Sequence, residues 1–275
     1  SDGRILFYLP WQGHTLVGTT DVPCDVSDRP VPTEEEIKWI ITEANNYLSP
    51  ECTIKRNDVL SAWSGIRPLA ADPHADPNGP VSRDHIVSVN PDTKTIFVAG
   101  GKWTTYREMA EDAIDKLLEV HPSVAKSAGT CKTLSVPLLG AQGYNRNLDL
   151  QLAKNHNLSP HVSSRLAKCY GGRAEEVLEF HSNEGGGGLL IEGFPYIKAE
   201  VIYACREYAR TVEDVLSRRT RLSYLNKLAA KTAVPVIADI MAGELGWTAD
   251  EKKVQIEQAF VFLETFSGPD AEESS

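Results

Sequence analysis

Short runs of β-prone residues, bounded by turn residues, recur in the first hundred positions of the chain. They predict two β-hairpins, one turning at residues 11–13 and the other at residues 90–92, and one further strand that ends beside Pro68. The predicted strands are residues 4–10, 14–19, 59–66, 85–89 and 95–99.

Apolar residues at helical spacing dominate from residue 131 onward, whereas only two helices are expected before it. The capping boxes Thr33–Glu36 and Thr248–Glu251 mark two helix starts. The clearest helical pattern of the second half, residues 199–217, is expected to turn Tyr208 inward. The predicted helices are residues 33–48, 107–120, 151–157, 161–170, 174–180, 199–217, 235–245 and 248–266.

The change of pattern along the chain predicts an α+β fold class. Strands and helices mix up to residue 122, a polar stretch at 123–130 is expected to be a linker, and residues 131–267 form an all-α domain. The glycine run 185–188 is interpreted as a flexible loop, because no Gly-Lys-Ser/Thr follows it. The acidic tail 268–275 is expected to be disordered.

The amino-acid composition argues against several classes of function. Of 275 residues, 41% are hydrophobic and 24% charged, which is typical of a globular protein. The formal net charge of −10 makes nucleic acid an unexpected partner. No apolar run is long enough to span a membrane. Five scattered cysteines without a Cys-x-x-Cys suggest neither a zinc site nor a disulfide framework. The abrupt start reads as a cut end rather than a natural N-terminus.

Candidate chemistry concentrates in the stretch Thr95–Tyr106, where a strand ends at Gly100-Gly101 and Lys102, Trp103, Thr104 and Thr105 lead into a helix. Glycines let another group approach the backbone, and the first amides of a helix stabilise an anion. Lys102 adds a full charge. An ordinary tight connection, with Thr104 or Thr105 capping the helix, is the structural alternative.

Two arginine motifs stand apart from that stretch. Arg67 ends a predicted strand and is restrained by Pro68, so it could bind a carboxylate or phosphate bidentately; a salt-bridged surface arginine is the alternative. The run 218–221 reads either as cations at a helix C-terminus or as a patch for an anion or a domain. Asp72, His74 and Asp76 could be drawn as a metal site, but a polar loop is favoured and no metal is predicted.

Several motifs together resemble one family. Leu9–Gly13 with Gly18–Asp21, then Ala62–Leu69, Ala99–Arg107, Phe194–Val201 and Leu216–Arg221 are similar to the FAD-dependent glycerol-3-phosphate dehydrogenases. The likeness covers about residues 2 to 266, and Gly-Lys-Trp-Thr-Thr-Tyr brings it closest to the mitochondrial branch.

The resemblance implies an organisation. Residues 1–84 would be part of a flavoprotein substrate domain, residues 85–122 the closing strand and helix of the FAD domain, and residues 131–267 the family's helical C-terminal domain. The N-terminal half with its Gly-x-Gly-x-x-Gly fold is absent from this sequence, as are the EF-hands of the mitochondrial branch.

The resemblance also implies a reaction: oxidation of sn-glycerol 3-phosphate to dihydroxyacetone phosphate, with a hydride passed to FAD and electrons to a membrane quinone. Arg67 and Lys102 are the implied catalytic and substrate-binding residues. Gly100, Gly101, Lys102, Trp103, Thr104 and Thr105 would bind the cofactor. No histidine here matches the family's general base, which is expected in the absent half.

Further expectations follow from the family. The protein would lie peripherally on the mitochondrial inner membrane, join the absent N-terminal half of the same enzyme and form a homodimer. Two alternatives stay open: another FAD-dependent oxidase of the same fold, or a non-catalytic folded interaction fragment. Without the nucleotide-binding fold, the isolated chain is expected to bind FAD poorly.

Overall fold

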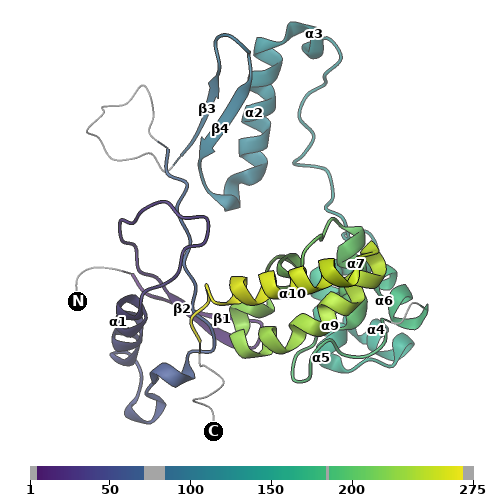
Figure 1. Ribbon diagram of the computed structural model, residues 1–275. Coiled ribbons are helices and arrows are strands. Elements are labelled where there is room, and N and C mark those ends of the chain that lie inside the picture. Colours follow the sequence, from purple (N-terminus) through teal and green to yellow (C-terminus); the bar gives the residue numbers. More distant parts are fainter. Residues whose placement is uncertain (1–4, 71–83, 184–185, 269–275) are drawn as a thin grey trace. The chain divides into compact units, whose positions relative to one another are not determined.

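The computed structural model describes residues 5–70, 84–183 and 186–268 (Figure 1). The chain divides into two compact units. Ser1–Gly65 joins Leu139–Ser275 in the first unit, and Ile66–Leu138 forms the second. The domain boundaries expected from the family resemblance refer to a larger protein, and they stay predictions.

The second unit is a hairpin with one long helix, as the pattern predicts. Strand β3 (His85–Val89) pairs antiparallel with β4 (Ile96–Gly100), and helix α2 (Tyr106–Val120) precedes the short α3 (Pro122–Ala125). Asn90 Oδ1 accepts from the amides of Asp92 and Thr93 and so closes the hairpin turn. No side chain of β3, β4 or α2 is fully buried within the described residues.

The first unit opens with the other predicted hairpin, β1 (Phe7–Trp11) paired with β2 (His14–Gly18). Helix α1 (Glu34–Asn45) begins at the predicted capping box, since Thr33 accepts from the Glu36 amide while the Glu36 carboxylate accepts from the Thr33 amide. Two short 3-10 turns follow, η1 (Pro50–Cys52) and η2 (Arg56–Asp58).

Helices make up the rest of the first unit, and together they enclose two hydrophobic clusters. Helix α7 contributes to both clusters, which explains why all of its residues from Ala199 to Cys205 are buried. The elements are α4 (Leu148–His156), α5 (Pro160–Tyr170), η4 (Gly171–Arg173), α6 (Ala174–Asn183), α7 (Lys198–Arg206), the π-helix η5 (Asp214–Arg219), α8 (Leu222–Leu225), α9 (Lys227–Leu245) and α10 (Ala249–Leu263). No described helix is both long and apolar enough to cross a membrane.

A buried ion pair joins α5 to α7. Arg165 and Glu200 are 7% and 1% exposed, and Arg165 Nη2 lies 2.9 Å from Glu200 Oε1. The same carboxylate accepts from the Tyr170 hydroxyl and from the Ile197 amide. Burial alone would lower the pKa of Arg165, but the adjacent Glu200 carboxylate more than offsets this and raises it.

The predicted strand 59–66 is wrong. Within it only Ala62 forms a bridge, to Ser267, which lies beyond the end of α10. The Leu60 carbonyl accepts a hydrogen bond from the amide of Lys227, the first residue of α9, and so is not available to a neighbouring strand. This segment therefore bonds to Ser267 and to the first residue of α9 instead of joining a sheet.

The single helix predicted at 199–217 is also wrong, because the chain breaks after α7. The Asp214 carboxylate accepts from the amides of Arg210 and Thr211 and so starts a new helical segment. Tyr208 lies in the break with φ of 72° and is 85% exposed, not inward. In the glycine run, Gly186 is buried and its amide donates to the Phe180 carbonyl.

Removing one partner of the buried pair should destabilise the helical part strongly. In Glu200→Ala the guanidinium of Arg165 is left buried without a counter-charge, at an expected cost of about 3–5 kcal/mol. Urea unfolding followed by circular dichroism measures the loss. The control is Glu175→Ala, which breaks the exposed His156–Glu175 pair and should cost at most about 1 kcal/mol. Equal losses in the two variants would contradict the expectation.

Candidate functional site

The candidate site is the turn between β4 and α2, which the sequence singles out. Gly100 and Gly101 adopt φ of 72° and 81°, a region that favours glycine. Lys102 is extended, and a 3-10 turn, η3 (Trp103–Thr105), leads into α2. The predicted helix start is therefore tighter than an α-helical first turn.

Protein atoms occupy the space that glycine leaves open at both positions. A Cβ on Gly100 would lie 3.1 Å from the Asp84 carbonyl oxygen and 3.2 Å from Ala70 Cβ. A Cβ on Gly101 would lie 2.8 Å from Met109 Sδ and 2.9 Å from His85 Cβ. The glycines thus let the turn pack closely on its own unit.

Some amides of the turn are used and others are not. Thr105 donates both its amide and its hydroxyl to the Lys102 carbonyl, and the Tyr106 amide bonds to the Trp103 carbonyl. Thr105 therefore makes no side-chain cap. Within the described part of the chain, the amides of Lys102, Trp103 and Thr104 have no acceptor. Three donors remain beside a lysine, which is an arrangement that suits an anion.

Lys102 and Trp103 project from this turn. The Lys102 side chain is exposed, and among the described residues it forms no ion pair. Trp103 is 89% exposed and its ring stacks on Tyr106, with 6.1 Å between centroids. So large an exposed aromatic surface beside free donors fits a planar, partly anionic ligand.

The structure brings the Arg67 segment to the same turn. Arg67 is exposed, and its carbonyl accepts from the Leu69 amide. Three residues later, Ala70 packs against Gly100. All predicted site residues therefore belong to the second unit, and Arg67 and the glycine turn are linked by direct packing of their neighbours.

His85 is a supporting residue that sequence reasoning missed. It pairs with Gly100 across the hairpin, and its Nε2 lies 2.7 Å from Asp112 Oδ2 on α2. The pair ties the strand to the helix behind the turn. The signal was available in principle, because the hairpin register sets a histidine opposite Gly100. Arg107, near the start of α2, donates through Nη1 to Glu111 and to the Thr133 hydroxyl.

The other candidates lie elsewhere. Arg218 pairs with Glu213 and Asp214, and Arg219 donates to the Glu207 carbonyl. These contacts engage Arg218 and one terminal nitrogen of Arg219, whereas Arg219 Nε is buried without a hydrogen-bond partner among the described residues. Both readings of the run 218–221 therefore stay predictions. Asp72, His74 and Asp76 lie outside the described residues.

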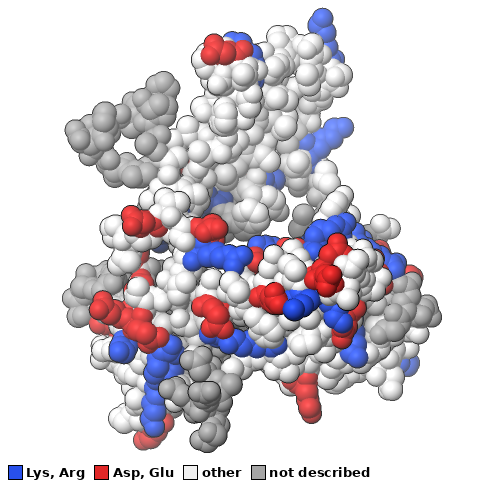
Figure 2. All heavy atoms as spheres, viewed as in Figure 1, with Lys and Arg blue, Asp and Glu red and all other residues white. Residues whose placement is uncertain are grey.

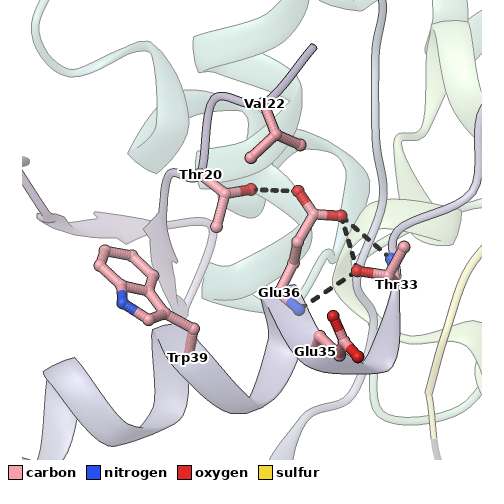
Figure 3. A pocket seen from close by; sticks show the side chains of 6 residues that line it. All are labelled: Thr20, Val22, Thr33, Glu35, Glu36 and Trp39. Atoms are coloured by element: carbon pink, nitrogen blue, oxygen red, sulfur yellow. Dashed lines mark hydrogen bonds between the residues drawn. The ribbon is translucent and has the colours of Figure 1, made fainter. Parts of the chain in front are cut away.

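A cavity of about 330 Å³ lies between α1 and the segment after β2 (Figure 3). Glu36 accepts from the Thr20 hydroxyl at 2.7 Å and from the Thr33 amide, and these bonds hold the pKa of Glu36 below its usual value. With Glu35 also on its wall, the cavity is acidic and disfavours a phosphate. The lining residues are Thr20, Val22, Thr33, Glu35, Glu36 and Trp39.

Comparison with known proteins extends this picture. Residues 1–126 match a family model described as FAD dependent oxidoreductase, and residues 131–252 match the C-terminal domain of alpha-glycerophosphate oxidase. Mitochondrial glycerol-3-phosphate dehydrogenase of Mus musculus is 44% identical over 96% of this chain. The chain belongs to the FAD-dependent glycerol-3-phosphate dehydrogenase family.

Other relatives agree with this assignment. A probable mitochondrial glycerol-3-phosphate dehydrogenase of Caenorhabditis elegans is 40% identical over the whole chain. The X-ray structure of the glycerol-3-phosphate dehydrogenase from Bacillus halodurans complexed with FAD superposes with a TM-score of 0.76 and 28% identity, over 96% of this chain and 52% of that one. The chain spans 36% of the length of the mouse protein and 38% of the worm protein.

Adding a methyl group at the second glycine should distort the turn. Gly101→Ala sets a Cβ against Met109 and His85 in a backbone region that L-residues rarely adopt, at an expected cost of about 1–3 kcal/mol. Amide hydrogen exchange of β3 and β4 measures the change. Gly129→Ala is the control, because this position has open space and an ordinary φ. Unchanged protection in Gly101→Ala would show that the turn tolerates the shift.

Proposed function

We propose that this chain belongs to an enzyme that oxidises sn-glycerol 3-phosphate to dihydroxyacetone phosphate with FAD and passes the electrons to a membrane quinone. The observation that carries the proposal is the turn from Gly100 to Thr105, with three amides lacking an acceptor and Lys102 beside them. The family assignment supports the same reaction. Relatives named mitochondrial support a mitochondrial location.

The backbone amides of the turn are the groups that would contact the flavin. Bound FAD supplies the acceptor for the hydride that leaves the substrate carbon. The reduced ring system carries negative charge, and the amides of Lys102, Trp103 and Thr104 are the groups that would stabilise it. Because these donors are held by the packed glycines, they need no rearrangement when the charge develops. Trp103 supplies an aromatic surface at the edge of the same turn.

Arg67 is the residue proposed to hold the substrate phosphate or hydroxyls. A guanidinium binds phosphate through two parallel hydrogen bonds, which sets both distance and orientation. Lys102 would act on substrate and flavin together, as a single mobile charge near both. The proton of the substrate hydroxyl needs a general base, and we assign that base to the nucleotide-binding half that the family resemblance implies.

The second unit carries surface that suits such a partner. Phe97, Val98 and Ile114 are 54%, 42% and 54% exposed, and Figure 2 shows few charged side chains over the β3–β4–α2 part on the viewed face. A unit as small as one hairpin and one long helix buries only a small share of its apolar surface. We propose that the nucleotide-binding half covers it, and that the assembled enzyme lies peripherally on the mitochondrial inner membrane as a homodimer.

A visible absorption spectrum, followed by dye reduction with glycerol 3-phosphate, tests the proposal. The chain alone should be nearly colourless and inactive, because little remains to hold the adenosine and pyrophosphate of FAD. Adding the nucleotide-binding half should restore a flavin spectrum that glycerol 3-phosphate bleaches. A coloured complex that glycerol 3-phosphate fails to reduce would overturn the proposal. Oxygen uptake in place of dye or quinone reduction would favour an oxidase.

Truncating the substrate arginine should separate binding of substrate from binding of flavin. In the assembled enzyme, Arg67→Ala should lower kcat/KM for glycerol 3-phosphate by about 100-fold or more, since it removes a charged bidentate contact, while the flavin spectrum is retained. Arg146→Ala, at another exposed arginine, should leave both unchanged. Equal turnover in Arg67→Ala and the wild type would contradict the assignment.

A further inference from the structure

One imidazole lies directly against the glycine turn of the second unit. His85 is the first residue of β3, and it pairs with Gly100, the last residue of β4. A Cβ built on Gly101 would lie only 2.9 Å from His85 Cβ, so the turn and this side chain are in close contact. The path that the chain takes out of β4 therefore depends on where His85 is held.

Helix α2 holds His85 through a carboxylate. Asp112 Oδ2 lies 2.7 Å from His85 Nε2, and the two side chains are 49% and 18% exposed. Because an ionised carboxylate only accepts hydrogen bonds, the imidazole donates from Nε2. Met109, three positions before Asp112 and on the same face of α2, is the other close neighbour of Gly101. One face of the helix thus contacts the turn directly and also through the imidazole.

The second unit has few other contacts that could fix the turn. Among the described residues, no side chain of β3, β4 or α2 is fully buried. Where the turn enters the helix, the amides of Thr105 and Tyr106 donate to the carbonyls two and three residues back in the same short segment, so these bonds do not join it to the hairpin. A hydrogen-bonded pair between strand and helix therefore carries a larger share of the local order than it would beside a packed core.

We propose that His85 and Asp112 are positioning residues that hold the unpaired amides of residues 102–104 in the orientation that suits reduced flavin. The proposal rests on the proposed function, because it takes these amides as the donors that contact the cofactor. The pair acts through the turn, not by contact with substrate or cofactor. Donors stabilise a developing charge best when they are oriented in advance, so a loosened turn weakens binding of the reduced flavin more than binding of the oxidised flavin.

The first test measures the reduction potential of the flavin in the assembled enzyme. In Asp112→Ala, the preference for reduced over oxidised FAD should fall about tenfold, which lowers a two-electron potential by about 30 mV. Asp112→Asn keeps an oxygen acceptor for His85 Nε2 and should stay within about twofold of the wild type. Glu119→Ala is the matched control, because it removes another carboxylate of α2, one that pairs with Lys116, and the potential should not change.

A direct effect of the Asp112 charge on the flavin predicts the opposite sign. Removing a negative charge near an anionic ring would raise the potential, and it would do so in Asp112→Ala and in Asp112→Asn alike. A potential raised in both variants, or unchanged in Asp112→Ala, would overturn the positioning role.

Hydrogen exchange on the 275-residue chain gives a readout that needs no flavin. The amides of Thr105 and Tyr106 should exchange about tenfold faster in Asp112→Ala than in the wild type or in Glu119→Ala, because the turn opens more often. Equal exchange in all three proteins would overturn the proposal. An assembled enzyme that binds FAD but does not oxidise glycerol 3-phosphate would instead defeat the proposed function, and the comparison of potentials would still decide the positioning role.

Discussion

The carboxylate of Glu200 could not remain buried in the helical core without the guanidinium of Arg165, and the contacts of the first unit extend outward from this pair. The guanidinium lies 4.2 Å above the ring of Tyr196. Tyr196 stacks on Phe194, and Phe194 stacks on His14 of the first hairpin, with 6.0 Å between centroids in each case. One continuous column therefore runs from the buried charge to the β1–β2 hairpin, so the helical part and the opening strands fold as one unit.

The second unit differs from the first, because a tightly packed turn, and not a buried hydrophobic core, holds its strands and helix together. At Gly100 and Gly101, atoms of other residues lie where a side chain would otherwise be. This close packing holds the turn in place and so orients the amides of Lys102, Trp103 and Thr104. The cost is that little apolar surface is buried in so small a unit. Any ligand or partner that binds only the folded form of such a unit would raise its stability.

Local chemistry explains which features could be predicted from the sequence. Capping boxes at Thr33 and Thr248 and the turn at Asn90 involve neighbours in the chain, and the structure has all three. The helix break at Tyr208 depends on the carboxylate of Asp214, six residues later. The conformation around Ala62 depends on its bridge to Ser267. Such distant partners leave no periodic signal. In the site, the glycine turn could be predicted from its residue types, whereas the packing of Ala70 on Gly100 and the His85–Asp112 pair required coordinates.

In an acidic protein, a site that suits an anion requires the charges to be separated in space. The net charge of −10 acts weakly at the site, because exposed charges farther away than about 8 Å are largely screened at physiological ionic strength. Near the turn, Lys102 and the free amides set the local potential. The acidic cavity beside α1 has the opposite character, since Glu35 and Glu36 line it. Position, rather than total charge, therefore decides where an anion binds, and among the candidate sites it favours the turn after β4.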